Sequence, residues 1–225
     1  FNLDVRTRSS VESIDRVAKT VAVRELTTDR VYTESYDKLI LAPGAAPVRP
    51  NIPGIDSPGV FTLRNLQDVD RIKQHLSSGV ARAVVVGGGF IGLEMVENFV
   101  RLGIPTTLVE RNHQVLGPLD AEMTTPILQT LRQHGVEVEF GENLNAIEST
   151  ADGLVMKFDS GKSLNASIAI IGVGVKPENQ LAIDAGLELG ARGGIKVDDH
   201  LQTSDPDIYA VGDVIAGPML AHKAE

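Results

Sequence analysis

The chain reads Arg82-Ala-Val-Val-Val-Gly-Gly-Gly-Phe-Ile-Gly92 a little before its midpoint. Residues 82–86 form an apolar run that predicts a short buried strand, and helical spacing follows the glycines as far as Gly103. A second apolar strand is predicted at 106–110, so strand, glycine turn, helix and strand succeed one another within about 30 residues. Such a βαβ unit has parallel strands. The stretch therefore predicts an α/β fold with a parallel sheet and helices.

Three glycines, Gly87, Gly89 and Gly92, lie at the junction of the predicted strand and helix. The first permits a tight turn, the second lets the backbone approach a pyrophosphate, and the third allows close packing of helix and strand. The helix start at Phe90 and Ile91 adds unpaired N–H groups and a partial positive charge. We therefore predict a Rossmann-like domain in which these five residues bind a dinucleotide. The alternative, a glycine-rich turn without a ligand, accounts for fewer of the features that agree here.

An acidic residue, Glu110, follows Gly92 by 18 residues, at the end of the second predicted strand. A carboxylate at about that interval accepts a hydrogen bond from the 2′-hydroxyl of the adenosine ribose, and it repels a 2′-phosphate. We therefore predict NAD(H) as the nucleotide. Arg111 leaves NADP(H) as the less favoured alternative, because a guanidinium beside the carboxylate can bind that phosphate.

The sequence before the glycines predicts strands and a linker. Alternating segments at 19–25 and 30–33, separated by Thr-Thr-Asp, predict a small antiparallel hairpin. The apolar run at 36–42 predicts a buried strand that ends in a turn at Gly44. Prolines recur between residues 45 and 59, which excludes a helix or a central strand. This segment is therefore predicted to be an ordered linker with a domain boundary after it.

Two further helices are predicted. Residues 65–76 have helical spacing, and four apolar residues share the face predicted to be buried: Leu66, Val69, Ile72 and Leu76. Residues 121–134 are predicted to form a helix that ends at Gly135, with His134 as a cation at its C-terminus. A strand at 136–140 follows.

The remaining strands are predicted to be short. Apolar segments at 145–148, 154–158 and 167–171 are joined by turn residues, which is typical of a three-stranded antiparallel meander. Two more strands are predicted at 195–197 and 207–211.

Composition argues against several classes of function. Of the 225 residues, 42% are hydrophobic and 23% are charged, as in ordinary globular proteins. The net charge of −9 and the lack of a basic cluster argue against binding of nucleic acid, because a polyanion requires a positively charged surface. The five histidines lack metal-binding spacing and there is no cysteine, so we predict no metal site and no thiol chemistry in this chain. No apolar run approaches the roughly 20 residues that span a bilayer, and we predict no membrane partner and a cytoplasmic location.

Three stretches carry a resemblance to a known family: Tyr36-Asp-Lys-Leu-Ile-Leu-Ala-Pro-Gly44, Ala169-Ile-Ile-Gly-Val-Gly-Val-Lys-Pro177 and Thr203-Ser-Asp-Pro-Asp-Ile-Tyr-Ala-Val-Gly-Asp213. With the glycine turn, they resemble the flavin-dependent pyridine nucleotide–disulfide oxidoreductases and stand in that family's order. The resemblance implies an FAD domain interrupted by an NAD(P)H domain and followed by a dimerisation domain. It divides the chain into a partial FAD segment and linker (1–59), an NAD(P)H-binding domain (60–194) and a second partial FAD segment (195–225). Pro43 replaces the family's threonine, so any role of that hydroxyl is lost.

The resemblance also implies roles for single residues. It places Glu94 beside the nicotinamide, paired with a lysine from a segment that this chain does not contain. From position alone, Glu94 is at least as well explained as a first-turn carboxylate that complements the helix dipole. The loop of Gly172, Val173 and Gly174 would lie near the nicotinamide and flavin rings. Gly44, Gly212 and Asp213 would contact FAD, with Asp213 on the ribityl chain.

The resemblance to subfamilies is mixed. Residues 60–70 and the nicotinamide domain are most similar to coenzyme A-disulfide reductases, NADH oxidases and polysulfide reductases, whereas 217–225 resembles dihydrolipoamide dehydrogenases. The longer stretch has more weight. The implied function is hydride transfer from NAD(P)H to FAD and on to a disulfide, polysulfide or dioxygen.

The start at Phe1 and the stop at Glu225 inside a helix-forming run suggest a piece of a longer, homodimeric enzyme. We predict that this piece is inactive alone and has no catalytic residue of its own. Two alternatives stay open: a non-catalytic module that senses NADH, and a flavoenzyme of the ferredoxin or rubredoxin reductase type.

Overall fold

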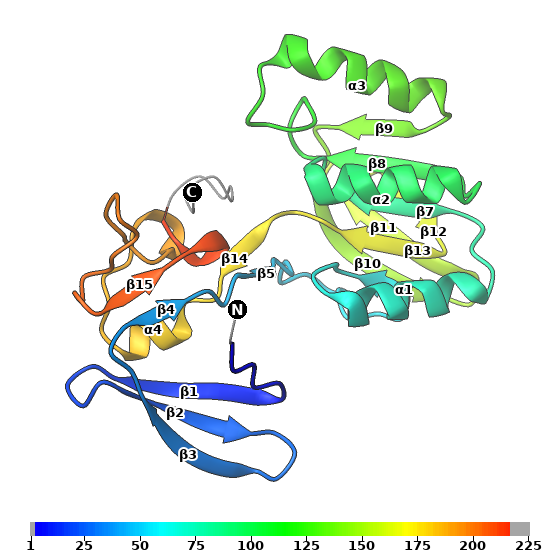
Figure 1. The fold of residues 1–225 in the computed structure, drawn as a ribbon. Coiled ribbons are helices and arrows are strands. Elements are labelled where there is room, and N and C mark those ends of the chain that lie inside the picture. Colours follow the sequence, from blue (N-terminus) through cyan, green and yellow to red (C-terminus); the bar gives the residue numbers. More distant parts are fainter. Residues whose placement is uncertain (1–2, 217–225) are drawn as a thin grey trace. The chain divides into compact units, whose positions relative to one another are not determined.

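The computed structural model describes residues 3–216, which form two compact units (Figure 1). Unit 1 combines the described residues of 1–46 and 176–225, and unit 2 is Pro47–Val175. Along the chain, unit 2 begins at Pro47 and ends at Val175, whereas the predicted domain borders are 59 and 194. The units are defined by contacts within the chain, and the assignment of three functional segments stays a prediction. The segment 217–225, which resembles dihydrolipoamide dehydrogenases, lies outside the described residues.

Unit 2 is built on a five-stranded sheet in which every pair of neighbours is parallel. Its strands, in spatial order, are β6 (Val60–Phe61), β13 (Ile168–Ile171), β7 (Ala83–Val86), β8 (Thr106–Glu110) and β9 (Glu137–Phe140). All residues of β13, β7 and β8 are buried, as expected for parallel strands that are covered on both faces. The predicted α/β class and the predicted βαβ unit are confirmed.

The two faces of this sheet have different covers. Alternate residues of the central strands, such as Val85 and Ile170, belong to one apolar cluster with side chains of the helices α1 (Leu66–Ser77), α2 (Phe90–Arg101) and α3 (Ala121–Gln133). The other alternate residues, such as Val84 and Ala169, contact an antiparallel meander. Its strands are β10 (Leu144–Thr150), β11 (Gly153–Phe158) and β12 (Ser163–Ala166). The sheet is therefore the middle layer of three.

The predicted third strand of the meander, 167–171, was wrong. That segment is β13, which pairs with β7 inside the parallel sheet, and β12 completes the meander. The physical reason is burial on both faces: Ile-Ala-Ile-Ile is continuously apolar and contacts both covering layers.

The predicted face of the helix at 65–76 was also partly wrong. Leu66 is 77% exposed, whereas Asp68 and Ile72 are the buried residues of α1. Asp68 turns inward because its Oδ2 accepts the backbone N–H groups of Arg64 and Asn65, which closes a capping box with Asn65. A residue two positions from Asp68 lies roughly 200° around the helix, so Leu66 faces solvent.

Unit 1 contains an antiparallel sheet of β1 (Ser9–Asp15), β2 (Thr20–Glu25) and β3 (Arg30–Ser35). The predicted hairpin is confirmed as β2 and β3, and β1 adds a third strand. A second, parallel pair joins β4 (Leu39–Leu41) to β15 (Ile208–Ala210). The short helix α4 (Gln180–Asp184) and the 3-10 turns η1 (Ala191–Gly193) and η2 (Gly212–Val214) complete the unit.

Two strand predictions in unit 1 need correction. The predicted buried strand at 36–42 is only the three-residue β4, and its Ile40 is 64% exposed. Residues 195–197 form no strand, because Ile195 makes single bridges to Leu189 and Ile215 instead. The strands β5 (Ala45–Pro47) and β14 (Val175–Pro177) lie at the borders of the two units. No helix within 3–216 is long and apolar enough to cross a membrane.

Candidate functional site

A pocket of about 470 Å³ opens in unit 2 at the carboxyl ends of the parallel strands. The strand β7 is central, with β8 and β9 on one side and β13 on the other, as Figure 1 shows, and β6 pairs with the outer edge of β13. The direction of winding therefore reverses between β7 and β13, and open α/β sheets bind ligands at such a point. The pocket is lined by Val48, Pro50, Val86, Gly87, Gly88, Gly89, Glu110, Arg111, Asn112, Gly117, Pro118, Glu142, Asn143, Leu144, Gly172, Val173 and Gly174.

The glycines of the turn have three different surroundings. A Cβ atom on Gly87, whose φ is +111°, would lie 2.2 Å from the carbonyl oxygen of Gly172. A Cβ on Gly92 would lie 1.9 Å from the carbonyl oxygen of Gly87, so both positions require a hydrogen side chain for packing. Gly89 has nothing within 4 Å of such a Cβ, although it lines the pocket. The space beside Gly89 is thus available for a ligand that approaches the backbone.

The helix α2 begins at the pocket. Gly89 is its N-cap, Phe90 and Ile91 are its first residues, and no acidic residue lies in its first turn. The first N–H groups of a helix have no partner within it, and with the helix dipole they favour an anion. Phe90 is 62% exposed.

Glu94 is the fifth residue of α2, so its predicted place in the first turn was wrong. The helix starts at Phe90, so Gly92 is already helical and Glu94 lies beyond the first turn. The dipole effect falls off beyond the first turn, which weakens the purely electrostatic explanation of this exposed carboxylate.

The carboxylate of Glu110 lies in the wall of the pocket and is held in place. Glu110 ends β8 and is only 9% exposed. Its Oε2 accepts the N–H of Gly88 at 2.6 Å, and its Oε1 accepts both the backbone N–H and the side-chain amide of Asn112 at 2.9 and 2.7 Å. Arg111, the next residue, is exposed and lines the same pocket.

The opposite wall is the loop that follows β13. The N–H of Gly172 donates to the carbonyl of Val86 at 2.7 Å, and Gly174 accepts from the N–H of Val48 at 2.9 Å. These bonds fix the loop beside the glycine turn, while the side chain of Val173 stays 42% exposed. The loop predicted from the family resemblance therefore lies against the predicted phosphate-binding turn.

The residues predicted to contact FAD lie in unit 1 and are brought together there. Because β4 and β15 are parallel, Gly44 and the pair Gly212–Asp213 follow neighbouring carboxyl ends. Gly44 and Gly212 have φ values of +75° and +77°, and a Cβ on either would meet nothing within 4 Å. Asp213 is exposed. Open backbone at the two glycines and an exposed carboxylate are compatible with the predicted contact with FAD.

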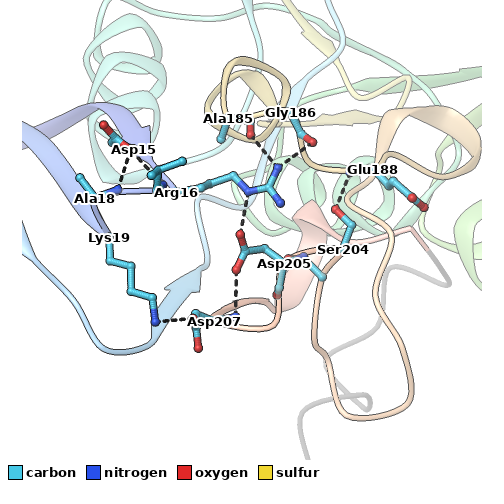
Figure 2. A network of polar contacts seen from close by, with 12 residues as sticks. Asp15, Arg16, Ala18, Lys19, Ala185, Gly186, Glu188, Ser204, Asp205 and Asp207 are labelled. Carbon is cyan, nitrogen blue, oxygen red and sulfur yellow. Dashed lines mark hydrogen bonds and ion pairs between the residues drawn. The ribbon is translucent and has the colours of Figure 1, made fainter.

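An ion-pair network fixes the segment before β15 (Figure 2). Arg16 donates from Nε to Asp205 at 2.7 Å and from Nη1 to the carbonyls of Ala185 and Gly186. Asp205 is 9% exposed, and the Arg16 guanidinium holds the pKa of its carboxyl below the ordinary value. Lys19 and Lys38 pair with Asp207 and lower the pKa of that carboxyl in the same way.

Sequence reasoning missed several of the pocket's residues. Gly88 and Asn112 act through hydrogen bonds between loops, for which the sequence has no periodic signal. Glu142 and Asn143 follow β9, and the rule that ligands gather at carboxyl ends of parallel strands points to them. Among residues 3–216, no group of three metal-ligating side chains occurs.

The chain is similar to known proteins over nearly all of its length. The profile of a family described as pyridine nucleotide-disulphide oxidoreductase matches residues 1–225. A coenzyme A disulfide reductase of Staphylococcus aureus (strain Newman) is 37% identical over 213 residues, which are 94% of this chain and 47% of that protein.

Two solved structures are similar in fold. One is the reduced Bacillus anthracis CoADR-RHD, with a TM-score of 0.91 and 46% identity over 96% of this chain and 39% of that chain. The other is a water-forming NADH oxidase from Lactobacillus brevis bound to NADH, with a TM-score of 0.87 and 34% identity over 96% of this chain and 50% of that chain. The chain spans about half the length of the curated relatives it matches.

Proposed function

Since this chain belongs to the pyridine nucleotide-disulphide oxidoreductase family, we propose that it is the nicotinamide-binding part of a longer flavoprotein. That protein transfers hydride from NADH to FAD and passes the electrons on to a disulfide, a polysulfide or dioxygen. Unit 2 binds the nicotinamide nucleotide, and unit 1 contributes to the binding of FAD.

The observation that carries this proposal is the pocket at the switch between β7 and β13. Its floor combines open backbone at Gly89 with the positive end of α2, which suits a pyrophosphate. Its wall holds the oriented carboxylate of Glu110, which suits a ribose diol. A volume of about 470 Å³ is within the range of ligand pockets.

We assign the parts of the nucleotide to the residues around the pocket. Gly87, Gly89 and the N–H groups of Phe90, Ile91 and Gly92 hold the pyrophosphate. Glu110 accepts from the ribose and disfavours a 2′-phosphate, so NADH is preferred to NADPH in spite of Arg111. The loop of Gly172, Val173 and Gly174 and the carboxylate of Glu94 face the nicotinamide.

In unit 1 we assign Gly44, Gly212 and Asp213 to FAD. When bound, the flavin supplies the hydride acceptor and the electron relay. The protein residues bind and orient it: the exposed carboxylate of Asp213 accepts hydrogen bonds from hydroxyl groups, and the open glycines allow close approach of the nucleotide. The chain has no cysteine, so a thiol that meets the final acceptor belongs to another part of the longer protein.

A calorimetric titration of the 225-residue chain with NADH and with NADPH tests the nucleotide assignment. The expected result is one NADH per chain, with weaker binding of NADPH. Gly89→Val is expected to lose NADH binding while the chain stays folded, because its side chain fills the open space beside the turn. If the folded chain binds neither nucleotide, the proposal is wrong. The chain alone is expected to show no NADH-dependent dye reduction.

Two further predictions concern the longer protein. The family resemblance implies a homodimer for the longer protein, and we place that protein in the cytoplasm. Sedimentation of the full-length product and fractionation of its cells test these two statements directly.

A further inference from the structure

Asn112 provides two of the three hydrogen bonds that hold the carboxylate of Glu110. Its backbone N–H and its side-chain Nδ2 both donate to Oε1, while Gly88 donates to Oε2. The direction of the amide is unambiguous, because an ionised carboxylate only accepts hydrogen bonds. The carboxylate thus connects the glycine turn after β7 to the loop after β8.

Two opposite charges compete at this corner of the pocket. Glu110 disfavours a 2′-phosphate on the ribose, whereas the guanidinium of Arg111 can bind one through paired hydrogen bonds. A glutamate side chain has three rotatable bonds, so its carboxylate excludes the phosphate only while something keeps it in place. In this structure the fixed carboxylate and the exposed arginine are adjacent in the chain and line one pocket.

We propose that Asn112 is the positioning residue that sets the preference for NADH over NADPH, by holding the Glu110 carboxylate where a 2′-phosphate would lie. This inference rests on the proposed function of the pocket. Asn112 acts through Glu110, and the carbonyl of Asn112 is itself fixed by the N–H of Gly141 at 3.3 Å. Loss of the side-chain amide leaves the backbone bond intact, so the carboxylate gains freedom without being expelled.

A double-mutant cycle tests the proposal. NADH and NADPH are titrated against the wild-type chain, Asn112→Ala, Glu110→Ala and the double variant. Asn112→Ala is expected to lower the ratio of NADH to NADPH association constants about tenfold, which corresponds to the low end of the range for one hydrogen bond to a charged group, because two of the three bonds to the carboxylate remain. In the Glu110→Ala background the same substitution is expected to change this ratio less than twofold.

Matched variants separate positioning from general damage. Asn165→Ala removes an exposed asparagine amide from the meander and is expected to leave the ratio unchanged. Asn112→Ser keeps a hydroxyl donor, and it is expected to fall between the wild type and Asn112→Ala. It also serves if the alanine variant does not fold.

The outcomes distinguish the inference from the function on which it rests. If the wild-type chain binds neither nucleotide, the proposed function fails and the inference fails with it. If it prefers NADH but Asn112→Ala and Asn112→Ser leave the ratio unchanged, only the role of Asn112 is wrong. An equal effect of Asn112→Ala with and without Glu110 also overturns the inference, because Asn112 would then act directly.

Discussion

Gly87 and Gly89 are two residues apart but differ in their surroundings. Gly87→Ala is expected to lower the free energy of unfolding by about 2–3 kcal/mol or more, because its Cβ meets the Gly172 carbonyl at 2.2 Å and its φ is positive. Gly89→Ala, at a φ of −81°, is expected to change it by less than about 1 kcal/mol. Chemical denaturation of both variants checks this contrast.

Although Gly89→Ala is expected to change the stability little, it is expected to weaken NADH binding. Gly89→Ala places a methyl group in the open space beside the turn and is expected to weaken NADH binding about tenfold. Equal NADH affinity in Gly89→Ala and the wild type would show that the nucleotide does not approach this backbone.

Glu110→Gln is a second test at single-residue resolution. An amide has one acceptor oxygen, whereas donors reach both oxygens of Glu110. We therefore expect a loss of about 1–2 kcal/mol in the free energy of unfolding, measured by urea titration. An unchanged stability would mean that the three hydrogen bonds to this carboxylate contribute nothing net.

The sequence alone indicated those pocket residues that have a fixed spacing along the chain, but not those that make hydrogen bonds between loops. The glycine triplet and the interval to Glu110 were visible because they belong to one βαβ unit. Gly88 and Asn112 were not, since their role depends on how two turns meet at the sheet edge. Nucleotide binding by any of these residues stays a prediction.

Two substitutions in the helix α1 test which of its faces is buried. Ile72 is 4% exposed, and Ile72→Ala is expected to lower the free energy of unfolding by about 2–4 kcal/mol. Leu66→Ala is expected to change it by less than about 0.5 kcal/mol, because Leu66 faces solvent. Thermal melts of the two variants check this. Comparable losses from both substitutions would restore the face predicted from sequence.

For whole elements, hydrophobic periodicity predicted whether a segment is a helix or a strand better than it predicted which element the segment packs or pairs with. The segment 167–171 was correctly expected to be a strand, but its apolar run does not say which sheet it joins. The adjacent β12, Ser-Leu-Asn-Ala, has a weak alternation that hid the true third strand of the meander. In α1, the apolar stripe was outweighed by the inward turn of a capping carboxylate.

For the molecule as a whole, we expect that a substitution in one unit lowers the stability of that unit without changing the other. Arg16→Met leaves the largely buried Asp205 without its guanidinium partner, and it is expected to cost unit 1 about 1–2 kcal/mol. NADH binding by unit 2 is expected to remain unchanged. Calorimetric melting with and without NADH checks both, and a parallel loss of NADH affinity would argue against independent units.

The same ion pair gives unit 1 a pH dependence. The pKa of Asp205 is lowered in the folded state by Arg16, so its contribution is complete above the unfolded-state value of about 3.9. It is lost as the pH falls through the lower folded-state value. The wild type is therefore expected to lose stability more steeply between about pH 5 and 2 than Arg16→Met. Identical slopes in acid denaturation would contradict this.

The α/β class and the family were predictable because their motifs are local and stand in order along the chain. The borders of the two compact units were not, since they depend on contacts between segments as distant as Arg16 and Asp205.

Hydrogen–deuterium exchange of the whole chain, with and without saturating NADH, tests the central claim most directly. We expect protection at the glycine turn and start of α2 (87–93), after β8 (110–112) and in the loop 172–174, with little change in β1, β2 and β3. Protection that is absent, or that falls mainly in unit 1, would contradict the assignment of this pocket to the nicotinamide nucleotide.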